Sequence, residues 1–136
     1  MAEADYFLSA ILPEMSYAPL LGFIEEGQLA STYWHNRRNE MPQDFWPTFR
    51  LTFPNVVEYL QLTSDVNVET GDCDNDLAGL LDFGDEENRY EYNNGVFTWR
   101  AHVWHFADWS PLEQFLTRRF GATAIEWRSD EDAEEL

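Results

Sequence analysis

The sequence contains no lysine, only one cysteine and no long apolar run. The single Cys73 cannot form an internal disulfide, whereas small secreted domains usually carry several cysteine pairs. No apolar stretch approaches the roughly 20 residues of a membrane-spanning helix, and the opening Met-Ala-Glu-Ala-Asp lacks the basic segment of a secretion signal. These absences predict a cytoplasmic protein that has neither a disulfide framework nor a membrane anchor.

Positive charge is scarce as well. All eight basic residues are arginine and 26 acidic residues oppose them, so the net charge is −18. Such a surface keeps a protein soluble but repels nucleic acid and anionic membranes. We therefore expect no direct binding to either of these, and we expect a basic protein to be the partner that this field attracts.

Signatures of catalysis are also missing. The chain has no glycine-rich phosphate loop and no nucleophile-elbow motif. Cys73 is surrounded by carboxylates, which disfavour the thiolate that a nucleophilic cysteine needs. Because carboxylates are so numerous, no pair of them stands out as a general acid and base. The sequence thus predicts a protein that is not an enzyme and holds no cofactor.

One acidic stretch has the spacing that opens a calcium-binding loop, namely Asp72, Asp74 and Asp76. Such a loop also needs glycine at its sixth position and glutamate at its twelfth, where this chain has Leu77 and Phe83. A solvated acidic loop is therefore the favoured interpretation.

A second candidate metal cluster consists of His102, His105 and Asp108. Residues three apart on a strand point to opposite faces, so the two imidazoles do not converge on one ion. No further group of Cys or His completes a ligand set, and we predict no metal site.

Aromatic residues are plentiful, with six Trp, six Tyr and ten Phe. Each of them can bury about 150–250 Å², so a chain of 136 residues is large enough for one hydrophobic core. Neither an internal repeat nor a linker indicates a second domain. We expect a single α+β domain over residues 1–128 and an acidic, mobile tail over residues 129–136.

The clearest local signals lie in the last third of the chain. Asn88–Tyr92 and Val96–His105 alternate as strands around an Asn-Gly turn. Ser110–Phe120 has the capping box Ser-x-x-Glu, proline at its second residue and two arginines in its last turn, so it predicts a helix that Gly121 ends. Ala122–Arg128 predicts a returning strand, with Thr123, Ile125 and Trp127 on one face.

The signals before residue 88 are weaker. We predict a strand over 5–12 and a helix over 16–29, capped by Ser16 and stopped by Gly27, with Pro19 in its first turn. Residues 30–47 suggest an aromatic-rich connection, and 48–53 suggest a strand. Residues 56–63 allow a strand or a short helix, and their β-branched and aromatic content favours the strand. The predicted fold is a mainly antiparallel twisted sheet with one or two helices packed on one face, and a ferredoxin-like arrangement is one form that this order allows.

The apolar residues on the core-facing side of these predicted elements should pack against one another. They are Phe97, Trp99, Val103, Phe115, Leu116, Ile125 and Trp127. Another group of aromatics could serve as a stacking platform: Tyr33, Trp34, Trp46, Trp104 and Trp109. Packing on the core is the favoured interpretation for that group, because platforms for nucleic acid come with a basic groove.

Acidic residues gather in what we call the acidic belt, residues 65–91. It contains ten acids in 27 residues, and the last eight residues of the chain contain five more. The ten, which we expect to contact a partner, are Asp65, Glu69, Asp72, Asp74, Asp76, Asp82, Asp85, Glu86, Glu87 and Glu91. Four apolar residues interrupt the belt and predict an attachment to the core: Leu77, Leu80, Leu81 and Phe83.

A concentrated acidic surface can imitate the charge of nucleic acid. Duplex DNA carries one negative charge per ~1.7 Å of its axis, and carboxylates at alternate positions of an extended segment lie about 6–7 Å apart on one face. In size, charge and one-domain architecture the chain resembles phage and plasmid anti-defence inhibitors, of the anti-restriction or anti-CRISPR type. This resemblance implies that the partner is a basic nuclease or a nucleic-acid-binding defence complex.

Two alternatives stay open. An immunity protein that neutralises a nuclease toxin would use the same physics, and a salt-adapted small enzyme or metal-binding protein would carry the charge as a solubility device. The uneven distribution of acids favours a directed surface over salt adaptation. A homodimer is compatible with each of these hypotheses.

The incomplete ligand sets generate a first testable prediction. Added calcium or zinc should not produce a saturable rise in melting temperature, because only specific binding to the folded state does so. Thermal unfolding should be followed at matched ionic strength, since any cation screens a net charge of −18. A saturable shift at micromolar metal would favour the metal-protein alternative.

Overall fold

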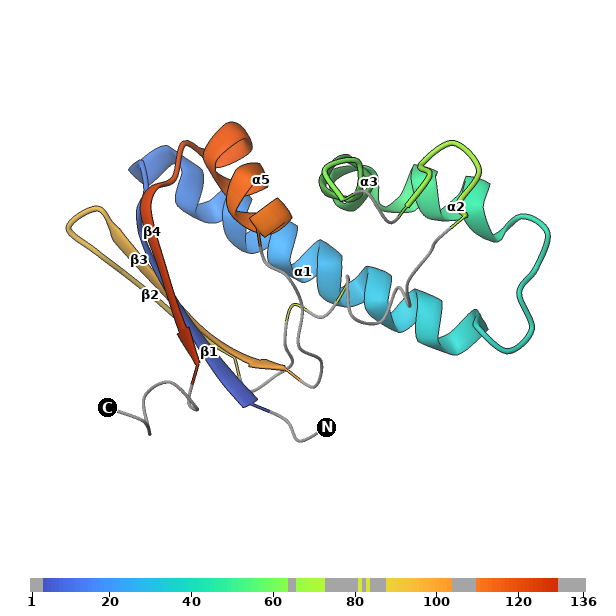
Figure 1. Cartoon of the computed structure of the whole chain (residues 1–136), viewed down its shortest axis with the longest axis horizontal. Coiled ribbons are helices and arrows are strands. Elements are labelled where there is room, and N and C mark those ends of the chain that lie inside the picture. The colour runs from blue at the N-terminus through green and yellow to red at the C-terminus, as the bar shows by residue number, and fades with distance from the viewer. Residues whose placement is uncertain are drawn as a thin grey trace.

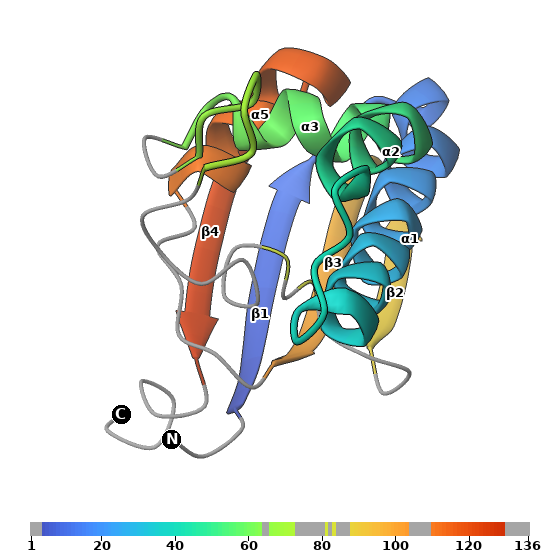
Figure 2. The same cartoon turned by 90° about the vertical axis from the view of Figure 1, so that its right-hand side faces the viewer.

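The described part of the chain forms a four-stranded antiparallel sheet with its helices on one face (Figures 1 and 2). The computed structural model describes residues 4–63, 66–72, 81, 83, 88–103 and 110–129, although not the side chains of residues 4, 5, 102, 103 and 129. In chain order the elements are β1 (Ala4–Ile11), α1 (Glu14–Arg37), α2 (Phe45–Thr52), α3 (Pro54–Leu60), β2 (Arg89–Asn93), β3 (Val96–Val103), α5 (Ser110–Phe120) and β4 (Thr123–Ser129). The predicted α+β class is confirmed.

The strands are ordered β2-β3-β1-β4, and every neighbouring pair is antiparallel. The connection from β1 to β2 therefore crosses β3, and the connection from β3 to β4 crosses β1. This is the double split βαβ arrangement of ferredoxin-like folds, with α2 and α3 added between α1 and β2. Because both crossovers lie on the same side, the described helices leave the other side of the sheet uncovered (Figure 1).

The predicted hairpin and the helix after it are present. Asn94 and Gly95 form the turn with φ of 50° and 82°, the left-handed values that a tight hairpin requires. Helix α5 ends at Gly121, whose φ is 72°, and the N–H of Ala122 donates to the carbonyl of Leu116 at 3.2 Å. The N–H of Gly121 donates to the carbonyl of Thr117 at 3.1 Å, which is the bond of an αL cap, so both bonds satisfy carbonyls at the helix end.

Helix α1 differs from the prediction at both ends. It begins at Glu14 and continues to Arg37, so Ser16 is not its cap and Gly27 does not stop it. Pro19 lies beyond the first turn, where its missing N–H leaves the carbonyl of Met15 without a helical donor. Both residues are exposed, so water can satisfy that carbonyl.

The strands predicted over 48–53 and 56–63 are wrong, because both segments belong to helices. The alternation of apolar residues over 48–53 wrongly indicated a strand. Leu51 is exposed, whereas the buried residues Phe45, Phe49 and Phe53 are spaced four apart. That spacing places three rings on one helical face. Pro54 begins α3, where a missing N–H has no cost.

Strand β4 contains an irregularity that changes its faces. Its register against β1 shifts between Ser9 and Ile11, and Ala124 has a φ of 52°. Thr123 therefore pairs with exposed Ile11, whereas Trp127 pairs with buried Leu8. The prediction that Thr123 shares a face with Trp127 is wrong, because a bulge shifts the alternation by one residue.

Most of the predicted core is buried. Phe97, Trp99, Phe115 and Leu116 are each at most 3% exposed, Ile125 and Trp127 are half-buried against the core, and the side chain of Val103 lies outside the described residues. The connection expected over residues 30–47 is largely helical, because α1 reaches Arg37 and α2 begins at Phe45. The predicted packing of the aromatic group on the core is nevertheless confirmed for its described members. Trp46 is buried, and Tyr33 and Trp34 pack on the core.

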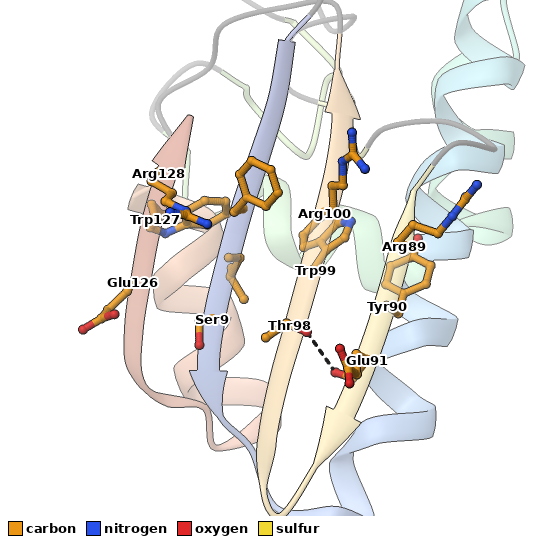
Figure 3. A pocket seen from close by; sticks show the side chains of 12 residues that line it. Ser9, Arg89, Tyr90, Glu91, Thr98, Trp99, Arg100, Glu126, Trp127 and Arg128 are labelled. Atoms are coloured by element: carbon orange, nitrogen blue, oxygen red, sulfur yellow. Dashed lines mark hydrogen bonds between the residues drawn. The ribbon is translucent and has the colours of Figure 1, made fainter. Parts of the chain in front are cut away.

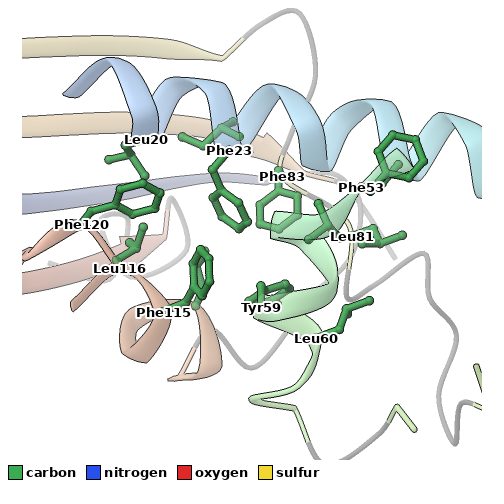
Figure 4. Close-up of a cluster of buried hydrophobic side chains, with 14 of the residues drawn as sticks. Leu20, Phe23, Phe53, Tyr59, Leu60, Leu81, Phe83, Phe115, Leu116 and Phe120 are labelled. Atoms are coloured by element: carbon green, nitrogen blue, oxygen red, sulfur yellow. The ribbon is translucent and has the colours of Figure 1, made fainter. Parts of the chain in front are cut away.

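Phe23 of α1 occupies the centre of this core (Figure 4). Its ring centroid lies 4.6 Å from that of Phe115 on α5, 6.1 Å from that of Tyr59 on α3 and 5.4 Å from that of Phe83. Aromatic pairs at such separations add stabilisation beyond the area that they bury. One side chain thus connects three helices and the acidic belt.

Replacing Trp99 with alanine should lower the free energy of unfolding by about 3–5 kcal/mol, because it empties a site that is 1% exposed. The matched control is Leu51→Ala on α2, where the side chain is 85% exposed, and its effect should stay within about 0.5 kcal/mol. Urea unfolding measures both changes. Equal effects from the two variants would contradict the packing of β3 described above.

Candidate functional site: the acidic belt and the open sheet face

Three of the ten predicted partner-binding acids are described: Glu69, Asp72 and Glu91 are all exposed. The other seven lie outside the described residues: Asp65, Asp74, Asp76, Asp82, Asp85, Glu86 and Glu87. Cys73, His105, Asp108, Leu77, Leu80, Trp104 and Trp109 lie outside them too, as does the side chain of His102.

The belt is attached to the core by two apolar residues, as the sequence predicted. Leu81 is 0% exposed and Phe83 is 3% exposed. The ring of Phe83 lies directly on the backbone of Gly27, where an added Cβ would come within 2.1 Å of the ring. Gly27 is therefore a contact site in the interior of α1, and this close approach explains a glycine at a position where it weakens a helix.

A polar contact holds the belt where it joins β2. Asn88 is buried, and its Nδ2 donates to the carbonyl of Phe83 at 2.8 Å and to the hydroxyl of Tyr90 at 3.1 Å. Burial raises the pKa of the Tyr90 phenol above its ordinary value, and hydrogen bonds with Asn88 and Gln28 offset part of the rise. The Tyr90 hydroxyl is thus a neutral partner that closes a buried network.

The first described part of the belt is a compact turn. Asn67 accepts bonds through its Oδ1 from the N–H groups of Glu69 and Thr70, and its own N–H donates to the carbonyl of Asp72 at 2.8 Å. The indole of Trp46 donates to the carbonyl of Val68 at 2.8 Å. The turn is therefore fixed against α2, and its carboxylates point outward from a closed loop instead of forming a row along an extended strand.

The three described acids of the belt lie in two separate parts of the structure. Glu69 and Asp72 share the turn beside α2, whereas Glu91 lies on β2 and faces away from the helices. This phase follows from the alternation of β2, because its neighbours Tyr90 and Tyr92 pack toward the core. The belt is thus not one continuous surface within the described residues.

The open face of the sheet, away from the helices, carries an arrangement that the sequence alone did not reveal. Arg89 pairs with Arg100, Arg100 with Phe7 and Phe7 with Arg128, so these four residues form one straight row across all four strands. We call it the arginine row. The guanidinium carbons of Arg100 and Arg128 lie 5.9 and 5.0 Å from the centroid of the Phe7 ring, within the range of cation–π attraction.

The next row across the sheet is polar and acidic. Glu91 pairs with Thr98, Thr98 with Ser9 and Ser9 with Glu126. Figure 3 shows the two rows side by side, with the arginines at one level and the Ser9–Thr98 level below them. Together they line an open groove of about 550 Å³. Alternation marks Arg100 as outward, but only the strand register places it beside Phe7, Arg89 and Arg128.

Comparison with known proteins adds no identification, since no family model, curated protein or solved structure matches the chain. Within the ranges that the structure describes, no three His, Cys, Asp or Glu side chains cluster as metal ligands. No helix among the same residues combines the length and the apolar character that crossing a membrane demands.

The contact between Gly27 and Phe83 can be tested within one helix. Gly27→Ala should lower the free energy of unfolding by about 1–3 kcal/mol, because its methyl group displaces the Phe83 ring. Gly22→Ala on the same helix meets no atom within 4 Å and should raise it by up to about 1 kcal/mol, because alanine is the better helix former. Urea unfolding that gave both variants the same sign would refute the seating of Phe83 on α1.

Proposed function

We propose that this protein is a non-enzymatic acidic inhibitor that imitates the charge of nucleic acid and blocks a basic nuclease or nucleic-acid-binding defence complex in the cytoplasm. The observation that carries the proposal is a net charge of −18 whose largest acidic segment, the belt, contains two residues packed in the hydrophobic core, Leu81 and Phe83. A charged loop attached in this way loses less conformational entropy on binding than a free acidic tail would.

The physics of such an inhibitor is that of opposite charges in water. A channel of Arg and Lys that binds phosphates attracts a rigid polyanion, and this attraction speeds the encounter and makes it sensitive to salt. The attachment points support this role, because neutralising acids beside them removes charge without removing core packing. The turn at 67–72 supports it in the same way, since backbone and Asn67 bonds hold it while Glu69 and Asp72 stay exposed.

The proposal predicts that six substitutions in the belt weaken inhibition progressively and leave the fold intact. They are Asp72→Asn, Asp74→Asn, Asp76→Asn, Asp85→Asn, Glu86→Gln and Glu87→Gln. Binding of the parent protein to a basic nucleic-acid-binding partner should fall steeply as salt rises, and the protein should not bind DNA itself. Co-purification from host lysate at low and high salt, followed by calorimetry with the captured partner, measures both effects.

The control variant removes the same number of charges outside the belt, at Glu3, Glu14, Glu25, Glu40, Asp44 and Asp108. The control variant should bind the partner more tightly than the belt variant does. Both variants lose the same total charge, which governs the rate of encounter, but only the belt variant loses the carboxylates that are proposed to contact the partner's Arg and Lys side chains. Equal affinity for the belt variant and the parent would overturn the mimicry hypothesis. Capture of a nuclease toxin encoded beside this protein would instead favour the immunity alternative.

A further inference from the structure

Strand β4 forms one edge of the sheet, and β2 forms the other (Figure 2). Within the described residues only β1 pairs with β4, so the outer side of β4 has no partner strand there. The backbone groups along such an edge can hydrogen-bond to another extended chain. The bulge at Ala124 bends the first part of β4, whereas residues 126–129 keep a regular register with β1.

The regular part of this edge carries two opposite charges, two residues apart. Glu126 and Arg128 are both exposed on the open face, and Figure 3 shows Glu126 pointing away from the other strands. The guanidinium of Arg128 lies over the Phe7 ring, but no hydrogen bond or ion pair holds either charged side chain within the described part of the chain. Trp127, between them, faces the helices and is half-buried.

We propose that a second copy of this chain binds to the outer edge of β4. The two β4 strands run antiparallel around a twofold axis that passes through Trp127 at right angles to the sheet. Such an axis keeps the open faces of both sheets on the same side. Glu126 and Arg128 are one position before and after Trp127, so each lies opposite the other residue type in the partner copy. The contact thus contains two ion pairs related by symmetry.

The charges select this register over its neighbours. An axis between two residues would place a core-facing side chain opposite an open-face one, so the axis must pass through a residue. An axis through Glu126 or through Arg128 opposes two like charges, which destabilises a sheet. An axis through Trp127 opposes unlike charges and also brings the two indoles together on the helix side, where aromatic cross-strand pairs are stabilising.

The other edge of the sheet has the same charge spacing, with Arg89 and Glu91 on β2. There both charges already have bonds within their own chain. Arg89 donates to the carbonyl of Asn88 at 2.9 Å, and Glu91 accepts a bond from the Nδ2 of Asn93 at 2.9 Å. The comparison favours β4 as the edge that joins two copies, and it supplies a matched control on β2.

The size and charge of the molecule set the conditions of the test. One strand from each copy makes a small interface, so the dimer should be weak and concentration-dependent. Two chains with a net charge of −18 each also repel one another. Sedimentation velocity on the full chain should therefore be run over a range of protein concentrations, in enough salt to screen this long-range repulsion.

The parent protein should show a monomer–dimer equilibrium. Glu126→Arg and Arg128→Glu should each raise its dissociation constant about ten- to a hundredfold, because each variant opposes like charges at both pairs. An equimolar mixture of these two variants should regain the dimer, since one supplies two arginines and the other two glutamates. The double variant that exchanges both charges should dimerise as the parent does.

The control is Glu91→Arg, which makes the same change of charge on β2 and should leave the dimer unchanged. Recovery in the mixture also shows that the two single variants are folded, and circular dichroism verifies it separately. The proposal fails if the parent stays monomeric, if Glu126→Arg has no effect, if the mixture does not recover, or if Glu91→Arg weakens the dimer equally.

This inference uses a different surface from the proposed inhibitor function and does not rest on it. The belt variant with its six neutralised acids should dimerise at least as tightly as the parent, because it removes repulsion between the copies and leaves β4 intact. Failure of that variant to bind a basic partner would leave the dimer as it was, so the two proposals can fail separately.

Discussion

The packing of aromatic rings around Phe23 is the constraint on which the rest of the molecule depends. Phe23 joins α1 to α5 through Phe115 and to the acidic belt through Phe83, and all of these rings lie on the same side of the sheet. A chain with a net charge of −18 is destabilised by its own repulsion, so burial of large rings must supply the opposing free energy. Concentrating that burial on one face leaves the other face of the sheet available for polar residues.

The two faces consequently carry different kinds of side chain. The helical side carries the attached belt, whose turn at Asn67–Asp72 and buried Leu81 hold acidic sequence against the body of the protein. The open side carries the arginine row, formed by residues that are far apart in the sequence and adjacent only in the sheet. Gly27 serves the first side by admitting the Phe83 ring, while strand register alone creates the second.

The parts of the fold that the sequence predicts are those with short-range causes. The turn at Asn94-Gly95 is predictable because Asn and Gly adopt the positive φ that a tight hairpin needs. The helix from Ser110 is predictable because Ser110 and Glu113 form a capping box at its start. Helix α2 was missed because Phe49, Leu51 and Phe53 alternate, although the spacing of four from Phe45 onward fits a helix. Over α3 the β-branched and aromatic content favoured a strand over a short helix. The arginine row could not be predicted, since it depends on which strands become neighbours and in which register.

The total charge of the protein and the charges within one groove act over different distances. A large basic partner that approaches from beyond about 8 Å responds to the sum of all charges, which is strongly negative here. The groove on the open sheet face instead brings Arg89, Arg100 and Arg128 beside Glu91 and Glu126, so charges of both signs lie close together there. Salt should therefore weaken association with a large basic partner, because that association depends on charge summed over a long range.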